Sequence, residues 1–507
     1  MSAEYIPAMY ATFWSLIPPI VAIGLALITK EVYSSLFIGI AVGAVFYSGF
    51  SFEGTLNHIF QGGIISVLSD PYNVGILVFL VLLGVLVCLM NKAGGSAAFG
   101  QWAADHIKTR AGAQLATMVL GVLIFVDDYF NCLTVGSVMR PLTDKHKVSR
   151  AKLAYLIDAT AAPVCIIAPI SSWAAAVTGF VPGEDGFTLF INAIPYNFYA
   201  LLTITFMIFL IGMKVDYGPM AAFEKTAQET GNLFGGKESV FPQEESRSSK
   251  GKVIDLVAPV VVLIICCIIG MLYTGDFFNG VGFVEAFSGS DASVGLAYGS
   301  FFGLLFTLVF YSLRRVLSFK DMMNCFPEGF KAMVPAILIL TFAWSLKAMT
   351  DSLGAGVFVS ELVKSSASSM MNFLPAIVFV VACLLAFASG TSWGTFGILI
   401  PIVVDALSSV DHTLMIIAIS ACMAGAVCGD HCSPISDTTI MASAGAQSEH
   451  VSHVSTQLPY AITVAVISFV VYILAGFVRS WVICLPVGIV LTGVVLLVIK
   501  KRTAARQ

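Results

Sequence analysis

The chain has 507 residues, of which 58% are hydrophobic and only 11% are charged, and its formal net charge is −4. Soluble globular chains carry roughly 25% charged residues, so this composition excludes an ordinary soluble domain and predicts a protein embedded in a lipid bilayer. The slightly acidic balance argues against a nucleic-acid partner. The 11 cysteines lie mostly inside apolar runs, which predicts small buried side chains and not a disulfide framework.

Apolar runs long enough for a membrane-spanning helix recur along the whole chain, since such a helix needs about 20 residues. We therefore expect an all-α polytopic membrane protein. Uninterrupted spans are predicted at 12–29, 33–50, 72–91, 187–213, 253–273, 293–312, 333–353, 457–477 and 481–499. Polar clusters interrupt four further apolar stretches, at 111–142, 151–180, 371–407 and 413–443. The one long hydrophilic stretch, 214–252, divides the chain almost in half and is expected to be a flexible linker.

Lysine and arginine placement predicts the topology, because short cytoplasmic loops collect positive charge. Segments with these residues, expected to be cytoplasmic, are Lys30, 92–110, 140–152, 214–252, 314–331 and 500–502. Loops without them, expected outside, are 51–71, 181–186, 274–292 and 408–412. This assignment makes 111–142 and 371–407 re-entrant hairpins, opening inward and outward respectively, while 151–180 and 413–443 cross as broken helices. We expect about eleven spans plus two hairpins in a bacterial inner membrane, with the N-terminus outside and the C-terminus cytoplasmic.

Two inverted repeats, 1–213 and 253–477, follow from this topology, and 478–507 forms a final helix and cytoplasmic tail. Short sequence echoes occur in the same order in both halves. They are Thr134-x-Gly136 with Pro141 against Thr395-x-Gly397 with Pro401, and Pro169-Ile170-Ser171 against Pro434-Ile435-Ser436. Inverted repeats with discontinuous helices near the membrane midplane are a transporter architecture. The sequence therefore predicts a secondary transporter whose site lies at the broken helices.

The predicted helix breaks supply the candidate site, because non-helical backbone at membrane depth is tolerated only where it lines an enclosed or watery cavity. Carboxylates in a membrane hairpin are costly unless they are hydrated, paired or bound to a cation. The predicted cation- and substrate-binding residues are Asp127, Asp128, Asn131, Asp158, Ser171, Ser172, Thr391, Ser392, Trp393, Asp430, His431, Ser433, Ser436, Asp437 and Thr438. Among them, Asp128, Asp430 and Asp437 are the predicted Na⁺ ligands, since hard cations prefer oxygen.

Other residues near these breaks have alternative interpretations. Trp173 and Trp393 suit ordinary packing as well as the lining of a substrate pocket. Lys347 is expected to reach the membrane surface from its helix in preference to acting as a counter-ion. His450 and His453 are predicted to lie in a solvated cytoplasmic loop.

Three runs resemble those of the NhaC-type sodium/proton antiporters, a family of the ion transporter superfamily. They are Gly429-Asp430-His431-Cys432-Ser433-Pro434-Ile435-Ser436-Asp437-Thr438-Thr439, Phe125-Val126-Asp127-Asp128-Tyr129 and Ala168-Pro169-Ile170-Ser171-Ser172-Trp173. The likeness covers most of the chain. It implies an elevator-like alternating-access mechanism, a homodimer, and Na⁺ and H⁺ as coupling ions. The same family name is carried by amino-acid and organic-acid carriers, so it indicates coupling chemistry better than cargo.

Two functions are therefore open. One is exchange of Na⁺ for H⁺, in which one carboxylate set binds either ion and the competition couples the two fluxes. The other is a Na⁺- or H⁺-coupled carrier of a small organic solute, with the tryptophans and helix N-termini forming the pocket. The sequence has no nucleotide motif, and Cys428-x-x-His431-Cys432 lacks a fourth zinc ligand, so we expect neither an enzyme nor a bound cofactor.

Overall fold

The computed structural model describes residues 7, 9–29, 31–125, 128–169, 171, 173, 177, 186–238, 251–358, 361, 370–407 and 411–504. Throughout these residues the regular structure is helical and no strand occurs. Within the same residues, seven helices are long and apolar enough to cross a membrane, or nine if each of two bent pairs forms one span. This confirms the predicted all-α polytopic membrane protein. The predicted total of about eleven spans stays a prediction.

The first half of the chain begins with η1 (Phe13–Leu16), α1 (Ile17–Thr29) and α2 (Val32–Tyr47). The helices that follow are α3 (Phe52–Asn57), the π-helix η2 (His58–Ile65), α4 (Ser66–Ser69), α5 (Pro71–Lys92), α6 (Gly95–His106), α7 (Arg110–Leu123), α8 (Asp128–Lys145), α9 (Arg150–Asp158) and α10 (Ala162–Cys165). After them come α12 (Gly186–Ala193), η3 (Ile194–Tyr196) and α13 (Phe198–Met213). One amphipathic helix, α14 (Pro219–Thr230), lies in the predicted linker.

The second half begins with α15 (Ile254–Thr274), α16 (Phe283–Ser288) and α17 (Ala292–Arg314), with a short η4 (Phe277–Asn279) between the first two. The remaining helices are α18 (Phe319–Ser352), η5 (Met371–Phe373), α20 (Leu374–Ser389), α21 (Ser392–Leu407), α22 (His412–Cys432), α23 (Asp437–Ala446), α24 (His450–Val478) and α25 (Trp481–Ala504).

Helix breaks occur close to three of the predicted positions. The first hairpin is interrupted between Leu123 and Asp128, and the second broken helix between Cys432 and Asp437. The second hairpin turns at Gly390, whose φ of 68° is readily adopted by glycine.

The first broken helix is interrupted earlier than predicted, between α9 and α10, as well as after Cys165. Pro163 explains the earlier interruption, since a proline ring clashes with the carbonyl four residues before it.

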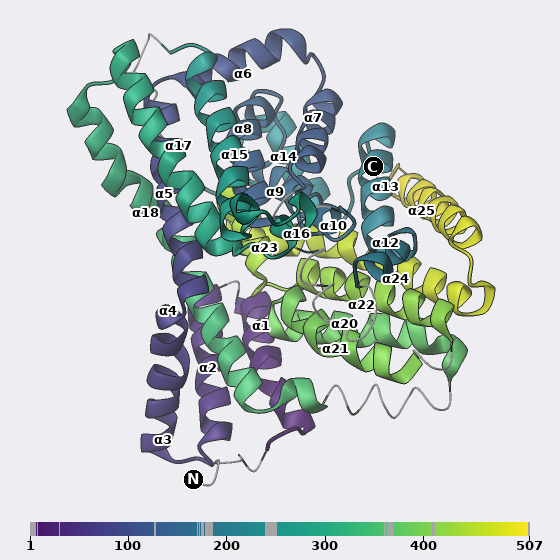
Figure 1. Cartoon of the computed structure of the whole chain (residues 1–507). Coiled ribbons are helices and arrows are strands. Elements are labelled where there is room, and N and C mark those ends of the chain that lie inside the picture. The colour runs from purple at the N-terminus through teal and green to yellow at the C-terminus, as the bar shows by residue number, and fades with distance from the viewer. Residues whose placement is uncertain are drawn as a thin grey trace.

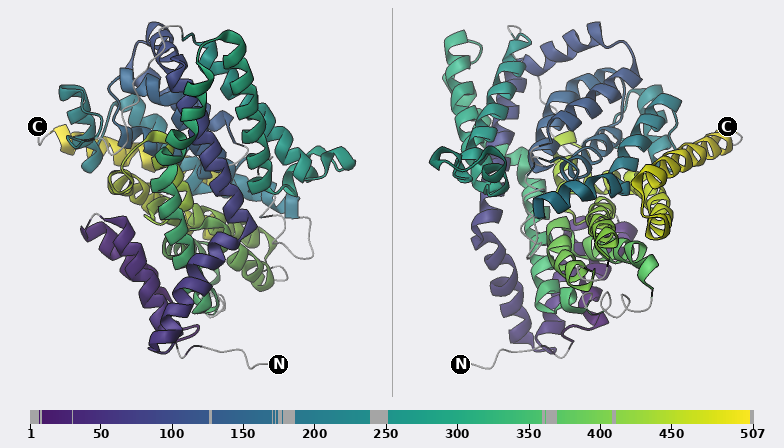
Figure 2. Two further views of the ribbon diagram at one scale, coloured as in Figure 1. Left: turned by 90° about the vertical axis from the view of Figure 1, so that its left-hand side faces the viewer. Right: turned by 45° about the vertical axis from the view of Figure 1, so that its right-hand side comes forward.

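Helices of the first half of the chain pack against helices of the second half. On one side of the molecule α2 packs on α18, and α17 packs on α5 (Figure 1). The views in Figure 2 show α5 and α18 running alongside each other through this side. Their backbones approach closely, because a Cβ atom on Gly84 would lie 2.6 Å from the carbonyl oxygen of Gly329. Such reciprocal contacts are what two related halves would produce. The inverted repeat itself stays a prediction.

The first hairpin packs against the second broken helix where α8 crosses α23. A Cβ atom on Gly136 would lie 2.6 Å from Cα of Gly445, and one on Gly445 would clash with the carbonyl of Cys132. Only glycine at both positions allows this separation. The crossing brings the start of α8 beside the start of α23, where Asp128 and Thr438 lie.

Gly445→Ala is expected to destabilise the protein by about 1–3 kcal/mol, because the added methyl group meets backbone atoms that cannot move aside. Gly212→Ala is the matched control, since a Cβ atom there would have no neighbour within 4 Å. The control is expected to change stability by less than ~1 kcal/mol. Thermal unfolding of both purified variants measures the difference, and equal unfolding temperatures would contradict the tight crossing.

Candidate functional site

Four carboxylates converge where α8, α9, α22 and α23 meet. Asp128 and Asp437 are the first residues of α8 and α23, whereas Asp158 and Asp430 lie at or near the ends of α9 and α22. The side chains of Asp128, Asp158 and Asp430 are almost fully buried, and Asp437 is half-buried. Helix N-termini stabilise negative charge, while helix C-termini present carbonyl oxygens that suit a cation. The cluster therefore combines both kinds of helix end.

Thr438 joins two of these carboxylates. Its hydroxyl oxygen lies 3.1 Å from Oδ2 of Asp128 and 3.3 Å from Oδ2 of Asp430. A hydroxyl has one proton and can donate to only one carboxylate at a time. Both contacts are satisfied together only if one carboxyl is protonated and donates to Thr438, or if a cation lies between the acids. Oδ1 of Asp430 is also buried without a hydrogen bond to any described residue.

Two aromatic donors orient the acids at the helix starts. Trp173 Nε1 donates to Oδ1 of Asp128 over 3.0 Å, and the Tyr129 hydroxyl donates to Oδ2 of Asp437 over 3.1 Å. The ring of Trp173 is fully buried and packs edge-on against that of Trp393, with centroids 5.9 Å apart. Trp173 thus packs in the core and contacts the acid cluster, and the lining of a substrate pocket by Trp173 and Trp393 stays a prediction.

Lys347 of α18 connects the tip of the second hairpin to the cluster. Its Nζ lies 2.6 Å from Oδ2 of Asp351, and its charge interacts favourably with Asp437. Thr391 and Lys347 both border Gly394 in this tip. Asp351 is 52% exposed and lies next to the last residue of α18, so the expectation that Lys347 reaches the membrane surface stays a prediction.

Asp158 ties four helices together. Its Oδ2 accepts hydrogen bonds from Thr439 Oγ1 over 3.0 Å and from Gln457 Nε2 over 2.7 Å. Its backbone oxygen lies 2.9 Å from Nε2 of His431, whose Nδ1 lies 3.2 Å from the Tyr199 hydroxyl. Nε2 of His431 must carry the proton that reaches this carbonyl, so both ring nitrogens of His431 have hydrogen-bond partners.

Five further predicted residues stabilise the breaks, because their side chains hydrogen-bond to backbone groups. The Nδ2 atom of Asn131 donates to the carbonyls of Gly121 and Ile124, at 2.6 and 2.7 Å, across the first hairpin tip. The hydroxyls of Ser171, Ser392 and Ser433 donate to the carbonyls of Cys165, Ala426 and Phe387, and Ser436 accepts from the Thr439 amide as the N-cap of α23. These hydrogen bonds hold the backbone that surrounds the cluster.

Of the remaining predicted residues, the structure describes Thr391 but not Asp127 or Ser172. Thr391 is half-buried at the tip of the second hairpin, where its carbonyl accepts from Thr395 over 3.0 Å. Asp127 and Ser172 lie outside the described residues. In the part of the chain that the structure describes, no three His, Cys, Asp or Glu side chains are spaced to hold a metal ion. Asp128, Asp430 and Asp437 thus do not form a preformed three-carboxylate site.

The prediction for His450 and His453 was wrong. Both side chains are buried, with 8% and 0% of their surface exposed, because α24 begins at His450 and extends seven residues before the predicted span. His450, His453 and Gln457 are spaced by three and four residues, which places them on one helix face. That spacing was the signal for a buried polar face. The sequence analysis also missed Tyr129, Thr439 and Gln457 as partners of the acids.

Two known bacterial proteins are similar to this chain in sequence. An uncharacterized protein of Haemophilus influenzae is 37% identical over 97% of this chain and 96% of its own. The malate-2H⁺/Na⁺-lactate antiporter of Bacillus subtilis is 29% identical over 34% of this chain and 36% of its own.

Two solved structures are also similar to this chain. MtrF of Neisseria gonorrhoeae has 15% sequence identity and a TM-score of 0.33, over 91% of this chain and 94% of its own. The YdaH transporter of Alcanivorax borkumensis has 14% identity and a TM-score of 0.35, over 90% of this chain and 98% of its own.

A family model described as the Na⁺/H⁺ antiporter family matches residues 164–477, which is more than half of the chain. The matched region contains Trp173, both arms of the second hairpin and the whole second broken helix. Two of the three sequence runs, 168–173 and 429–439, lie inside the matched region, and the match confirms the resemblance. This multi-pass membrane protein therefore belongs to the Na⁺/H⁺ antiporter family.

Proposed function

We propose that this transporter exchanges Na⁺ for H⁺ across a bacterial inner membrane. The observation that carries the proposal is the single Thr438 hydroxyl shared by Asp128 and Asp430. A Na⁺ ion between these acids neutralises their repulsion and takes oxygen ligands. When Na⁺ leaves, a proton on one carboxyl restores a complete set of hydrogen bonds. The two ions therefore compete for one site, and this competition couples their opposite fluxes.

Each residue of the cluster has a role in this proposal. Asp128, Asp430 and Asp437 bind Na⁺ or H⁺, Thr438 links the acids, and Asp158 positions their helices. We further propose the cytoplasmic placement of 214–252 and of the C-terminus, with the N-terminus outside, on the basis of the charged loops. A homodimer and an elevator-like movement are proposed from the family resemblance alone.

A coupled carrier of a small organic acid or amino acid is the second candidate. The observation that favours it is the pair of Trp173 and Trp393 rings beside Asp128, since aromatic faces commonly line solute pockets. The Bacillus subtilis relative is described as a malate and lactate antiporter, which agrees with this candidate. In that case Na⁺ or H⁺ moves together with, or against, the solute.

Proteoliposomes that contain an internal pH indicator distinguish the two functions. For vesicles with an acidic interior, external Na⁺ is expected to raise the internal pH in the absence of any organic solute, whereas equal K⁺ is expected to have no effect. A response that requires malate, lactate or an amino acid would favour the second candidate. No Na⁺-dependent proton movement under either condition would contradict Na⁺/H⁺ exchange, and the absence of Na⁺- or H⁺-driven uptake of these solutes would contradict the second candidate.

A further inference from the structure

The Ser443 hydroxyl on α23 has more acceptors around it than it has protons. Its Oγ lies 2.8 Å from the carbonyl oxygen of Thr439, 2.9 Å from Nδ1 of His450 and 2.9 Å from Nδ1 of His453. All three side chains are buried. A serine hydroxyl donates once and accepts twice, so at most one of the three neighbours can receive its proton.

The opposite ring nitrogens show which histidine atoms can accept. Nε2 of His450 lies 2.7 Å from the carbonyl oxygen of Pro434, so it carries a proton. Nε2 of His453 lies 3.0 Å from Oε1 of Gln457, whose amide nitrogen already donates to Asp158 and to the His431 carbonyl. Nε2 of His453 must therefore carry a proton and donate it to Oε1 of Gln457. In two neutral rings both Nδ1 atoms are then bare acceptors that face one hydroxyl proton.

We propose that His450, Ser443 and His453 form a proton-binding site, next to Asp158 of the carboxylate cluster, that holds one proton between the two imidazoles. With His453 protonated, its Nδ1–H donates to Ser443 Oγ, and the Ser443 hydroxyl donates to Nδ1 of His450. Transfer of the His453 proton to Ser443, with transfer of the Ser443 proton to His450, moves the charge to the other ring. Each arrangement completes the hydrogen bonds of both rings.

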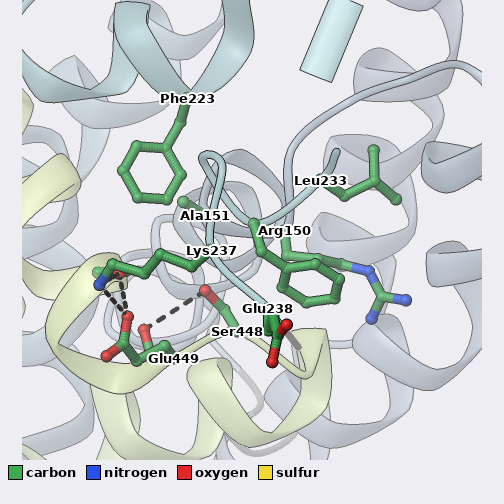
Figure 3. Close-up of a pocket in the computed structure, with 10 residues that line it drawn as sticks. Arg150, Ala151, Phe223, Leu233, Lys237, Glu238, Ser448 and Glu449 are labelled. Carbon is green, nitrogen blue, oxygen red and sulfur yellow. Dashed lines mark hydrogen bonds and ion pairs between the residues drawn. The ribbon is translucent and has the colours of Figure 1, made fainter. Parts of the chain in front are cut away.

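Asp158 is the anionic neighbour that favours a cation at this position. From α9, its Oδ2 lies 3.7 Å from Nε2 of His453, whereas a positive charge on His431 of α22 would oppose protonation of His453. At the solvent edge, Lys237 pairs with Glu449, the residue before His450, and Arg150 donates to the carbonyl of Ala446. Figure 3 shows this edge, with Lys237 beside Glu449 and Ser448 nearby. This edge lies on the side proposed to be cytoplasmic.

Nitrogen-15 NMR of histidine-labelled protein in lipid nanodiscs tests the site directly. Between pH 5 and 9 we expect one buried imidazolium in the wild type, and its loss in Ser443→Ala and in His453→Gln. His106→Gln is the matched control, because His106 is exposed on α6, and it is expected to leave that signal unchanged. Neutral rings at both His450 and His453 over this whole range would overturn the proposal.

A role of this proton in transport rests on the proposed Na⁺/H⁺ exchange, and a second measurement separates the two ideas. His453→Gln is expected to shift the pH dependence of Na⁺-driven proton flux by about one pH unit, while His106→Gln leaves it unchanged. An unshifted profile would remove the site from the transport cycle. If the wild type shows no Na⁺-driven proton flux, the proposed function fails, while the NMR result still decides whether the proton site exists.

Discussion

Asp128→Asn is expected to lower the apparent Na⁺ affinity by about 100-fold and to abolish transport at ordinary Na⁺ concentrations. Asparagine keeps the shape of the side chain, so Trp173 retains an acceptor and the protein should fold. The substitution removes the negative charge that Na⁺ requires, and it places an amide group against Thr438. The Na⁺ dependence of proton flux in proteoliposomes measures the effect, and we expect the same result from Asp437→Asn.

Asp105→Asn is the matched control for this experiment. Asp105 is exposed near the end of α6, so its removal is expected to leave Na⁺ dependence unchanged. Wild-type rates with unchanged Na⁺ dependence in both Asp128→Asn and Asp437→Asn would make these carboxylates structural. The cation would then have to be sought among the neutral hydroxyls, such as that of Thr391 at the second hairpin tip.

Asp216→Asn is expected to destabilise the protein by about 3–5 kcal/mol, because it leaves the buried ammonium group of Lys152 without its partner. The Lys152 side chain is 1% exposed, and its Nζ lies 2.6 Å from Oδ1 of Asp216. The Tyr460 hydroxyl donates to the same oxygen over 2.8 Å, so α9, α24 and the segment after α13 meet at this carboxylate. Thermal unfolding of the purified variant measures the loss.

An exposed ion pair provides the control for Asp216. Lys225 and Glu229 lie one helical turn apart on α14 at 3.9 Å, and both side chains are more than half exposed. Glu229→Gln is expected to change stability by less than ~0.5 kcal/mol, since water screens such a pair. Equal destabilisation by the two substitutions would mean that the burial of Lys152 has no energetic consequence.

The buried ion pair of Lys152 and Asp216 makes the stability of the protein depend on pH. Burial alone raises the pKa of Asp216, but the charge of Lys152 and the hydrogen bonds from Lys152 and Tyr460 outweigh it and lower the pKa below its ordinary value. The stabilisation is therefore present above the unfolded-state pKa, and it is lost as pH falls through the lower folded-state pKa. The gap in unfolding temperature between wild type and Asp216→Asn should narrow over that acidic range.

Sequence reasoning located the helix breaks because their causes are local. Glycine at position 390 and the polar run from Gly429 to Thr439 interrupt helices without help from distant residues. Pro163 was an equally local signal that was overlooked. The hydrogen bond from Thr438 to Asp128 joins residues 310 positions apart, so only the packing of α8 on α23 shows which hydroxyl serves which acid. Likewise, a polar face of α24 looks solvated until its buried partners are known.

The glycine contact between α8 and α23 restricts how the transporter can change shape. Gly136 and Gly445 lock the first hairpin to the second broken helix, with almost no space for one backbone to slide past the other. In the proposed transport cycle Asp128 and Thr438 therefore move together, and the movement takes place at other surfaces, such as the one where α23 meets α18.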